Sequence, residues 1–507
     1  MDVFSMRDVR CIWDGETMGN LSRELEQNLK IMNSLFEDCE DIKSRKMQLG
    51  KEADVSACIF YVEVTVNNLT VEESVIGKLL SRLMDKTGEE IYDYLDRNAL
   101  GITDVKELAT VEEATMGVMI GDGVLFIDGY DKAIKIKSKG YPMMGLTESR
   151  TEKVIRGSRE GFADAVKMNT SLLRKRLRTP KLKIKEKIIG QYANTTVAIA
   201  YIDGLARQSV IDNIEKRIDS LEVDELTDTG IIEQLTEKSQ KTPFPIYQTT
   251  ERPDKAVEEI VKGRVVLFVD NTPIALIMPS NFSSFFQTAD DYYNKPSVVS
   301  FARVLRYIAA FLAISLPAIY LAVVNYHSEI LPMALLESMA KAREGVPFPA
   351  LLEVLFMELS FELLREAGIR IPGYAGSTMS IVGGLIVGQS AVSAGLISPV
   401  MVIVVALTAL ASYAVPNEEI ASAFRLCKYG LIGLASVLGL FGVAIGWLII
   451  IGHMAGLKSF NFPYLYPFTG GELYNDRDLR DAIYRKEFEH DLQGSFYRKR
   501  KKNQGKG

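Results

Sequence analysis

The stretch Ile371–Asn417, IPGYAGSTMSIVGGLIVGQSAVSAGLISPVMVIVVALTALASYAVPN, contains no charged side chain. It is longer than the roughly 20 residues that one helix needs to cross a bilayer. Gly395 and Pro399 lie near its middle and are typical turn residues. The stretch therefore predicts two membrane crossings joined by a tight turn, and it places the protein in a membrane.

Other apolar segments flank this stretch. Val304–Val324 predicts a first span, in which Pro317 is expected to introduce a kink. Tyr429–Leu457 is uncharged and predicts a last span. Leu331–Glu344 mixes charges into an apolar pattern, which is typical of a helix lying along the membrane surface. Ala350–Glu366 is apolar but holds Glu353, Glu358 and Glu362, so it is either a polar-lined span or a re-entrant helix.

Basic residues set the expected orientation. Arg303 and Arg306 lie at the entrance of the first span, and a basic cluster, Arg498–Lys502, lies in the tail. Both should be cytoplasmic by the positive-inside rule, which requires an even number of crossings. We expect four full spans, with Ala350–Glu366 entering and leaving on one side. Counting that segment as a full span would place the basic tail outside.

The residues before the spans are polar and charge-rich, and they alternate between strand-like and helix-like patterns. The predicted fold class is two α/β cytoplasmic N-terminal domains followed by an all-α polytopic membrane domain. The alternation favours a mixed or parallel sheet in these domains. The predicted parts are a helical arm (1–49), a first α/β domain (50–145), a second α/β domain with a linker (146–300), the membrane domain (301–457) and a basic cytoplasmic tail (458–507).

Composition and motifs argue against several classes of function. The net charge of -6 gives no global reason to expect nucleic acid as a partner. The basic run Arg174–Lys187 lacks interleaved aromatics, which favours a solvated helix face or a lipid-facing patch. No catalytic motif, cofactor motif or metal-ligand spacing occurs, so the sequence predicts neither an enzyme nor a cofactor or metal site. The N-terminus shows no secretory signal pattern, so we expect the N-terminal domains to be cytoplasmic.

Three glutamates within the apolar segment 350–366 are the candidate pore-lining residues. Ionised carboxylates are costly in hydrocarbon and normally face water, protein or an ion path. Glu358 and Glu362 share one helical stripe, whereas Glu353 lies roughly opposite. Several copies of this helix around a symmetry axis could surround a cation path. The alternative is that Glu362 pairs with a nearby arginine, Arg365 or Arg370, at a wet interface.

Small residues and a helix end supply further candidates. Gly384 and Gly388 form one pair, and Gly442 and Gly446 another, at which helices could pack closely within one subunit or between subunits. Candidate gating or interface residues are Pro317, His327 and Glu329. The histidine could be a proton relay or ligand contact, or a solvated residue at a helix end.

Seven motifs give the chain a family resemblance. They are RGSREGF (156–162), TERPD (250–254), ADDYY (289–293), NYHSEILP (325–332), GVPFP (345–349), LLREAG (363–368) and SIVGGLIVGQSAV (380–392). In motif order and spacing, from about residue 50 to Pro467, the chain resembles the A subunit of the GerA-type spore germination receptors. The resemblance implies a protein of the inner membrane of bacterial endospores. It also implies a transporter-like B subunit that binds nutrients and a lipoprotein C subunit as partners.

The same resemblance implies that copies oligomerise into a nutrient-gated cation channel. Ser158 stands where many receptor subunits have proline, so the stage V sporulation protein AF, a paralogue proposed to form a related channel, stays an alternative. A secondary transporter is a further alternative, but it predicts internal inverted repeats, and the sequence shows none. We expect the linker at 281–300 to couple the α/β domains to the membrane helices.

Overall fold

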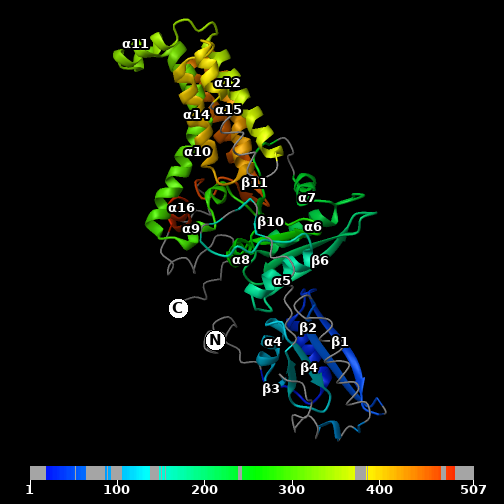
Figure 1. The fold of residues 1–507 in the computed structure, drawn as a ribbon. Coiled ribbons are helices and arrows are strands. Elements are labelled where there is room, and N and C mark those ends of the chain that lie inside the picture. Colours follow the sequence, from blue (N-terminus) through cyan, green and yellow to red (C-terminus); the bar gives the residue numbers. More distant parts are fainter. Residues whose placement is uncertain are drawn as a thin grey trace. The chain divides into compact units, whose positions relative to one another are not determined.

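The fold is taken from a computed structural model that describes residues 19–51, 53–63, 86–87, 90–92, 105–137, 148–149, 151–152, 154, 156–237, 242–371, 384, 386–469 and 476–485. The chain divides into two compact units. Unit 1 contains residues up to Thr236 together with Thr249–Met278, and unit 2 contains Glu237–Gln248 and the residues from Pro279 to Phe496. Figure 1 shows the elements of each.

Unit 1 contains two five-stranded sheets. The first has the strand order β1-β2-β4-β5-β3 and packs α1 and α4 against one face. Its elements are α1 (Leu25–Leu35), β1 (Ile42–Leu49), β2 (Val55–Val62), β3 (Val105–Leu108), α4 (Val111–Met119), β4 (Gly123–Ile127) and β5 (Ala133–Ile136).

The second sheet has the order β6-β7-β9-β10-β8 and buries one face against α5 and α8. Its elements are α5 (Val166–Arg176), β6 (Leu182–Ile189), β7 (Thr195–Ile202), α6 (Gln208–Asp219), α7 (Thr229–Thr236), β8 (Gln248–Thr250), α8 (Pro253–Val261), β9 (Val265–Val269) and β10 (Ala275–Met278).

The two sheets are copies of one fold. Their strand orders match position by position, and β1 and β2 correspond to β6 and β7 with an offset of 140 residues. Local hydrogen bonds are duplicated as well: Asp128 accepts from the backbone N–H at the start of α1, and Asp270 does so at the start of α5, each at 2.9 Å. The same strand order and the same hydrogen bond in both sheets indicate an internal duplication within unit 1.

Two expectations for this region are wrong. Residues 1–49 are not simply a helical arm, because Ile42–Leu49 is strand β1, paired with β2 along its whole length. The sheets are not parallel. In the first sheet the pairs β1–β2, β2–β4, β4–β5 and β3–β5 are antiparallel, and in the second sheet the pairs β6–β7, β7–β9 and β9–β10 are antiparallel. Short hairpin turns join β1 to β2 and β6 to β7, and such turns can only connect antiparallel neighbours.

Unit 2 is a helical bundle with short flanking segments. In the described residues, α10 and α15 are long and apolar enough to cross a membrane, and α14 is a shorter apolar helix. Helix α11 has no buried residue and lies at the end of the bundle opposite α9 and α16 (Figure 1). The elements are η2 (Phe282–Phe286), α9 (Asp290–Tyr293), α10 (Pro296–Tyr326), η3 (Ser328–Ile330), α11 (Met333–Ala342), α12 (Ala350–Arg370), α14 (Pro399–Tyr413), α15 (Glu418–Gly456), β11 (Lys458–Ser459), β12 (Phe462–Pro463) and α16 (Asp476–Ile483).

The tight turn expected inside the uncharged stretch is confirmed. Gly395 has φ of +66°, a left-handed conformation that glycine adopts without steric cost. Ser398 caps α14 by accepting a hydrogen bond from the backbone N–H of Met401, and Pro399 is the first helical residue. Residues 386–393 before the turn are helical. The part of the stretch from 372 to 383 lies outside the described residues.

Helix α15 is a hairpin rather than one straight span. Gly439 has φ of +60° and ψ of -140°, which is not helical. A side chain built on Gly446 would lie 2.3 Å from Leu431, fifteen residues earlier. In a straight helix those positions would be about 22 Å apart at 1.5 Å per residue. The chain therefore reverses at Gly439, and the segment predicted as a single last span consists of two antiparallel arms.

Candidate functional site

Helix α12 carries the three glutamates that the sequence singles out, and each of them meets a partner in its own chain. Lys428 of α15 donates to one carboxylate oxygen of Glu358, and the two side chains are 5% and 3% exposed. The other oxygen, Oε1 of Glu358, is buried without a hydrogen-bond partner among the described residues. An ion pair therefore joins α12 to α15 inside the apolar bundle.

Glu362 lies one helical turn further along the same face. Its Oε1 atom is 3.3 Å from Arg425 Nε of α15 and 3.6 Å from Arg365 Nη1 of α12. Arg425 also contacts Glu418 at 2.8 Å. Both stripe glutamates thus face cations of α15, and the pairing of Glu362 with Arg365 matches the alternative considered from the sequence.

Glu353 is held at the other end of α12. It accepts a hydrogen bond from Arg343 at 3.0 Å and another from the backbone N–H of Ser398 at 3.0 Å. Its side chain is fully buried. Glu353 therefore connects the start of α12 to the end of α11 and to the start of α14. Glu358 and Glu362, in contrast, contact α15.

The candidate packing glycines all contact helices of their own chain. A Cβ on Gly442 would lie 2.2 Å from the carbonyl oxygen of Leu434, so both Gly442 and Gly446 allow the two arms of α15 to approach closely. A Cβ on Gly384 would lie 3.4 Å from Phe361 of α12, and one on Gly388 would lie 3.2 Å from Val402 of α14.

The gating candidates lie along α10 and at its end. Pro317 is buried inside α10, and Glu329 is exposed in η3. His327 follows the last residue of α10 and lies against the α15 turn, where a Cβ on Gly439 would be 2.8 Å from the histidine Cε1. The neighbouring Tyr326 donates a 2.6 Å hydrogen bond to the carbonyl of Ser436. This end of α10 therefore holds the tip of the hairpin.

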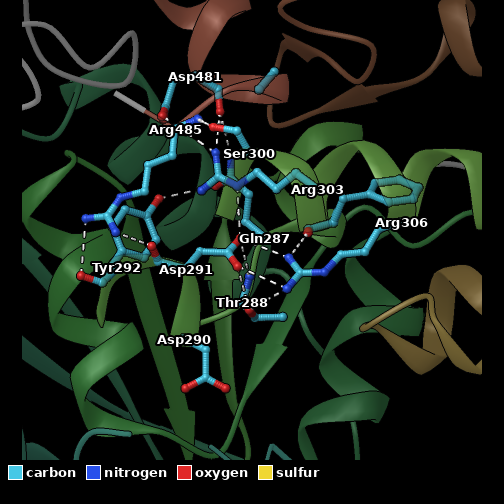
Figure 2. Close-up of polar contacts among 12 residues, drawn as sticks. Gln287, Thr288, Asp290, Asp291, Tyr292, Ser300, Arg303, Arg306, Asp481 and Arg485 are labelled. Atoms are coloured by element: carbon cyan, nitrogen blue, oxygen red, sulfur yellow. Dashed lines mark hydrogen bonds and ion pairs between the residues drawn. The ribbon is translucent and has the colours of Figure 1, made fainter. Parts of the chain in front are cut away.

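A second charged cluster, which the sequence reasoning missed, lies at the start of α10 (Figure 2). The buried carboxylate of Asp291 accepts from Arg303 Nε at 2.9 Å and from both terminal nitrogens of Arg306 at 2.9 and 3.0 Å. Burial by itself raises the pKa of Asp291, but the hydrogen bonds and charges of Arg306 and Arg303 outweigh burial and lower it. The sequence signal that could have revealed this cluster is the motif ADDYY, followed by Arg303 and Arg306 at helical spacing.

The same cluster binds the C-terminal helix. Arg303 donates to the carbonyl of Asp481 at 2.6 Å, and Tyr307 donates to the carbonyl of Ala482 at 3.2 Å. Arg485 donates to the carbonyl of Asn294 at 2.7 Å and lies over the ring of Tyr292 (Figure 2). Part of the segment expected as a basic tail is thus a folded helix, α16, docked on the base of α10.

A strap of residues 242–248 also belongs to unit 2, although unit 1 both precedes and follows it in the chain. Phe244 packs against Phe424 and Tyr464, with ring centroids 6.3 and 6.4 Å apart. The carbonyl of Ile246 accepts hydrogen bonds from the hydroxyls of Ser280 and Ser459. The chain therefore connects the two units through this strap as well as through the segment after Met278.

Known proteins are similar in sequence to this chain over nearly its whole length. The sequence pattern of the Bacillus/Clostridium GerA spore germination protein matches residues 30–493. The chain belongs to the GerA spore germination protein family. The uncharacterized membrane protein YfkQ of Bacillus subtilis (strain 168) is 39% identical over 92% of this chain and 89% of its own length. Spore germination protein KA of the same organism is 34% identical over 92% of this chain and 85% of its own.

Among solved structures, the N-terminal domain of the A subunit of the Bacillus megaterium spore germinant receptor GerK3 covers 53% of this chain and 99% of its own. Its TM-score is 0.42 and its identity is 26%.

Two of the motifs that carry the GerA resemblance contact each other. Arg252 of TERPD is buried and donates to the carbonyl of Ser158 in RGSREGF at 2.9 Å. Phe162 of the same motif donates its backbone N–H to the carbonyl of Glu251 at 2.7 Å. These motifs therefore form one structural junction at the start of α8.

Proposed function

We propose that this chain is the membrane subunit of a spore germination receptor and that it forms or gates a cation path in the inner spore membrane. Family membership and several relatives named as spore germination proteins support the germination role. A transporter-like B subunit, a lipoprotein C subunit and further copies of the chain are the proposed partners. The observation that carries the cation path is the buried Glu358–Lys428 pair.

The gating proposal rests on the energetics of that pair. Desolvation makes a buried ion pair a weak net stabiliser, although breaking it by removing one partner is costly. A signal that prefers a second packing of α12 against α15, in which water solvates both separated charges, could therefore release Glu358 at a modest cost. Glu358 would then offer a carboxylate to a passing cation, as acidic side chains do in cation channels.

The contacts also support a revised count of crossings. The turn at Gly439 lies beside the end of α10, and the start of α12 contacts the turn before α14 at Ser398. At the opposite end, Arg365 of α12 lies over the ring of Tyr413, the last residue of α14. This pattern supports six passes: α10, α12, the helix containing residues 386–393, α14 and the two arms of α15. Six is even, so both basic ends remain on one side.

A labelling experiment tests the count. In the six-pass arrangement Val437→Cys lies at the outer tip of the hairpin, and it should react with a membrane-impermeant maleimide from the outer side. With Tyr429–Leu457 as one straight span, the same cysteine would lie mid-membrane and stay unlabelled. Leu448→Cys, exposed halfway along the second arm, is the matched negative control. Equal protection of both positions would reject the hairpin.

Replacing Glu358 with glutamine tests the cation path. We expect Glu358→Gln to alter the rate or the Na⁺/K⁺ preference of cation release from germinating spores at equal protein level. The substitution keeps the side-chain shape but removes the charge that Lys428 and a cation would share. Glu366→Gln is the control, because Glu366 pairs with Arg370 on its own helix. Release identical to the parent in both variants would refute the assignment.

A second candidate function is a paralogous role that amplifies germination without a nutrient-binding partner. It is favoured by Ser158, because many of the receptor subunits that the chain resembles have proline at this position. Deleting the chain would then slow germination by all nutrients equally, whereas deleting a receptor subunit would abolish the response to one.

A further inference from the structure

The internal duplication places two equivalent sheet edges in unit 1, and one of them is occupied. The outer edge of β6 pairs in parallel with a short acidic segment, Glu37–Asp41. The N–H of Ile184 donates to the carbonyl of Asp38, and the N–H of Glu40 donates to the carbonyl of Ile184, both at 3.0 Å. This is strand addition of the kind by which sheets bind extended peptides.

Lysines of β6 hold that acidic segment. Lys183 donates to the carbonyl of Glu37, and Lys185 lies 3.2 Å from the carboxylate of Asp38. The N–H of Glu186, which also faces outward, donates to the carboxylate of Glu40 at 2.8 Å. Backbone pairing and opposite charge thus act together at this edge.

Strand β1 is the equivalent of β6. With the offset of 140 residues, Lys43 corresponds to Lys183, Ser44 to Ile184 and Arg45 to Lys185. Ile184 is fully buried, but Ser44, Arg45 and Lys46 are exposed. Within the described part of the chain, β2 is the only strand that pairs with β1.

The corresponding segment of the second repeat is a poor occupant for this edge. Pro180 stands at the position of Glu40, and proline has no N–H to donate. A second copy of the chain therefore cannot repeat the two-bond addition with its own second repeat. Its segment is also basic, with Arg178 and Lys181 in place of acidic residues.

We propose that the outer edge of β1, centred on Ser44, binds an extended acidic segment of a partner protein by parallel strand addition. The occupied edge of β6 is the template for both the backbone pairing and the charge. An exposed strand edge that carries lysine is otherwise a common protection against aggregation, and the experiment separates these two roles.

The test uses the full chain in detergent and a fluorescent peptide, LFEDSED, which copies residues 35–41 with serine in place of the cysteine. Ser44→Pro removes the outward N–H, whereas Ser44→Ala keeps it and serves as the matched control. Proline is tolerated at a strand edge whose N–H faces solvent. We expect Ser44→Ala to bind the peptide within about twofold of the parent and Ser44→Pro to bind at least about tenfold more weakly. Arg45→Glu should also lose the acidic peptide, which covers the case in which the proline variant fails to fold.

Hydrogen exchange locates the binding. We expect the peptide to slow exchange of the Ser44 and Lys46 amides. Protection that appears at Ile184 instead, or a Ser44 amide already protected in the free chain, would overturn the proposal. So would equal binding by the alanine and proline variants. Anionic phosphatidylglycerol vesicles that bind parent and Ser44→Pro alike while displacing the peptide would identify a lipid patch, and this too would overturn it.

Discussion

Lys428→Ala is expected to destabilise the bundle by about 3–5 kcal/mol, because it leaves the carboxylate of Glu358 buried without its partner. The measurement is thermal unfolding of the purified chain in detergent. Lys341→Ala is the matched control, since Lys341 forms a solvent-exposed pair with Glu337 on α11, and such pairs contribute little. A Lys428→Ala variant as stable as the control would mean that Glu358 finds water or another partner.

A double replacement distinguishes the loss of the whole ion pair from the loss of one charge that leaves the other buried and unpaired. Glu358→Leu with Lys428→Met should recover most of the lost stability, because an apolar pair of similar size avoids the desolvation of two charges. The double variant should nevertheless release cations poorly if Glu358 serves the path. Recovery of stability together with normal release would leave the pair a purely structural role.

Sequence patterns located most of the elements of unit 1 because their apolar alternation and turn residues are local. Gly123–Ile127, an apolar run that ends at the turn residues Asp128 and Gly129, is strand β4, and α8 begins at Pro253, a residue that is favoured in the first helical turn. Strands β1 and β6 were missed. Both are edge strands in which lysine or arginine occupies alternate positions, so their composition resembles a solvated helix or a basic patch.

The duplication shows which signal was overlooked. Residues 124–128, VLFID, and 266–270, VLFVD, are nearly identical and occupy equivalent places in the two sheets. They are separated by 142 residues, and the similarity is short, so pattern reasoning within one domain does not find it. The basic run 174–187 is explained by the same repeat, because Arg174, Lys183 and Lys185 contact acidic residues or carbonyls of the first repeat. A lipid-facing role for that run is therefore not needed.

In the bundle, composition predicted apolar helices but not their partners. The sequence places Glu358 and Glu362 on one stripe, and this follows from helical geometry alone. It does not indicate that Lys428 and Arg425, far along the chain, face that stripe, because this depends on how the chain returns through α14. The reversal at Gly439 was also hidden, since glycine is common in membrane helices and gives only a weak turn signal there.

Asp291→Asn is expected to release α16 from the base of α10. The substitution removes the charge that neutralises Arg303 and Arg306, both of which also bind backbone carbonyls around the cluster. Arg303 would keep only the more distant carboxylate of Asp481, at 3.6 Å, and removing one partner of a buried ion pair costs about 3–5 kcal/mol. Hydrogen exchange of residues 476–485 measures the docking directly. Asp290→Asn is the control, because the Asp290 carboxylate points away from the arginines (Figure 2).

The pH dependence of this docking follows from the lowered pKa of Asp291. A folded-state pKa below the unfolded value of about 3.9 means that the carboxylate stabilises the docked state fully above that pH, and that this contribution is lost as the pH falls through the lower folded value. Protection of α16 should thus be constant from about pH 7 to 5 in the parent chain and weaker at every pH in Asp291→Asn. Equal protection in the Asp291 and Asp290 variants would show that the carbonyl contacts of Arg303 and Arg485 hold α16 without the carboxylate.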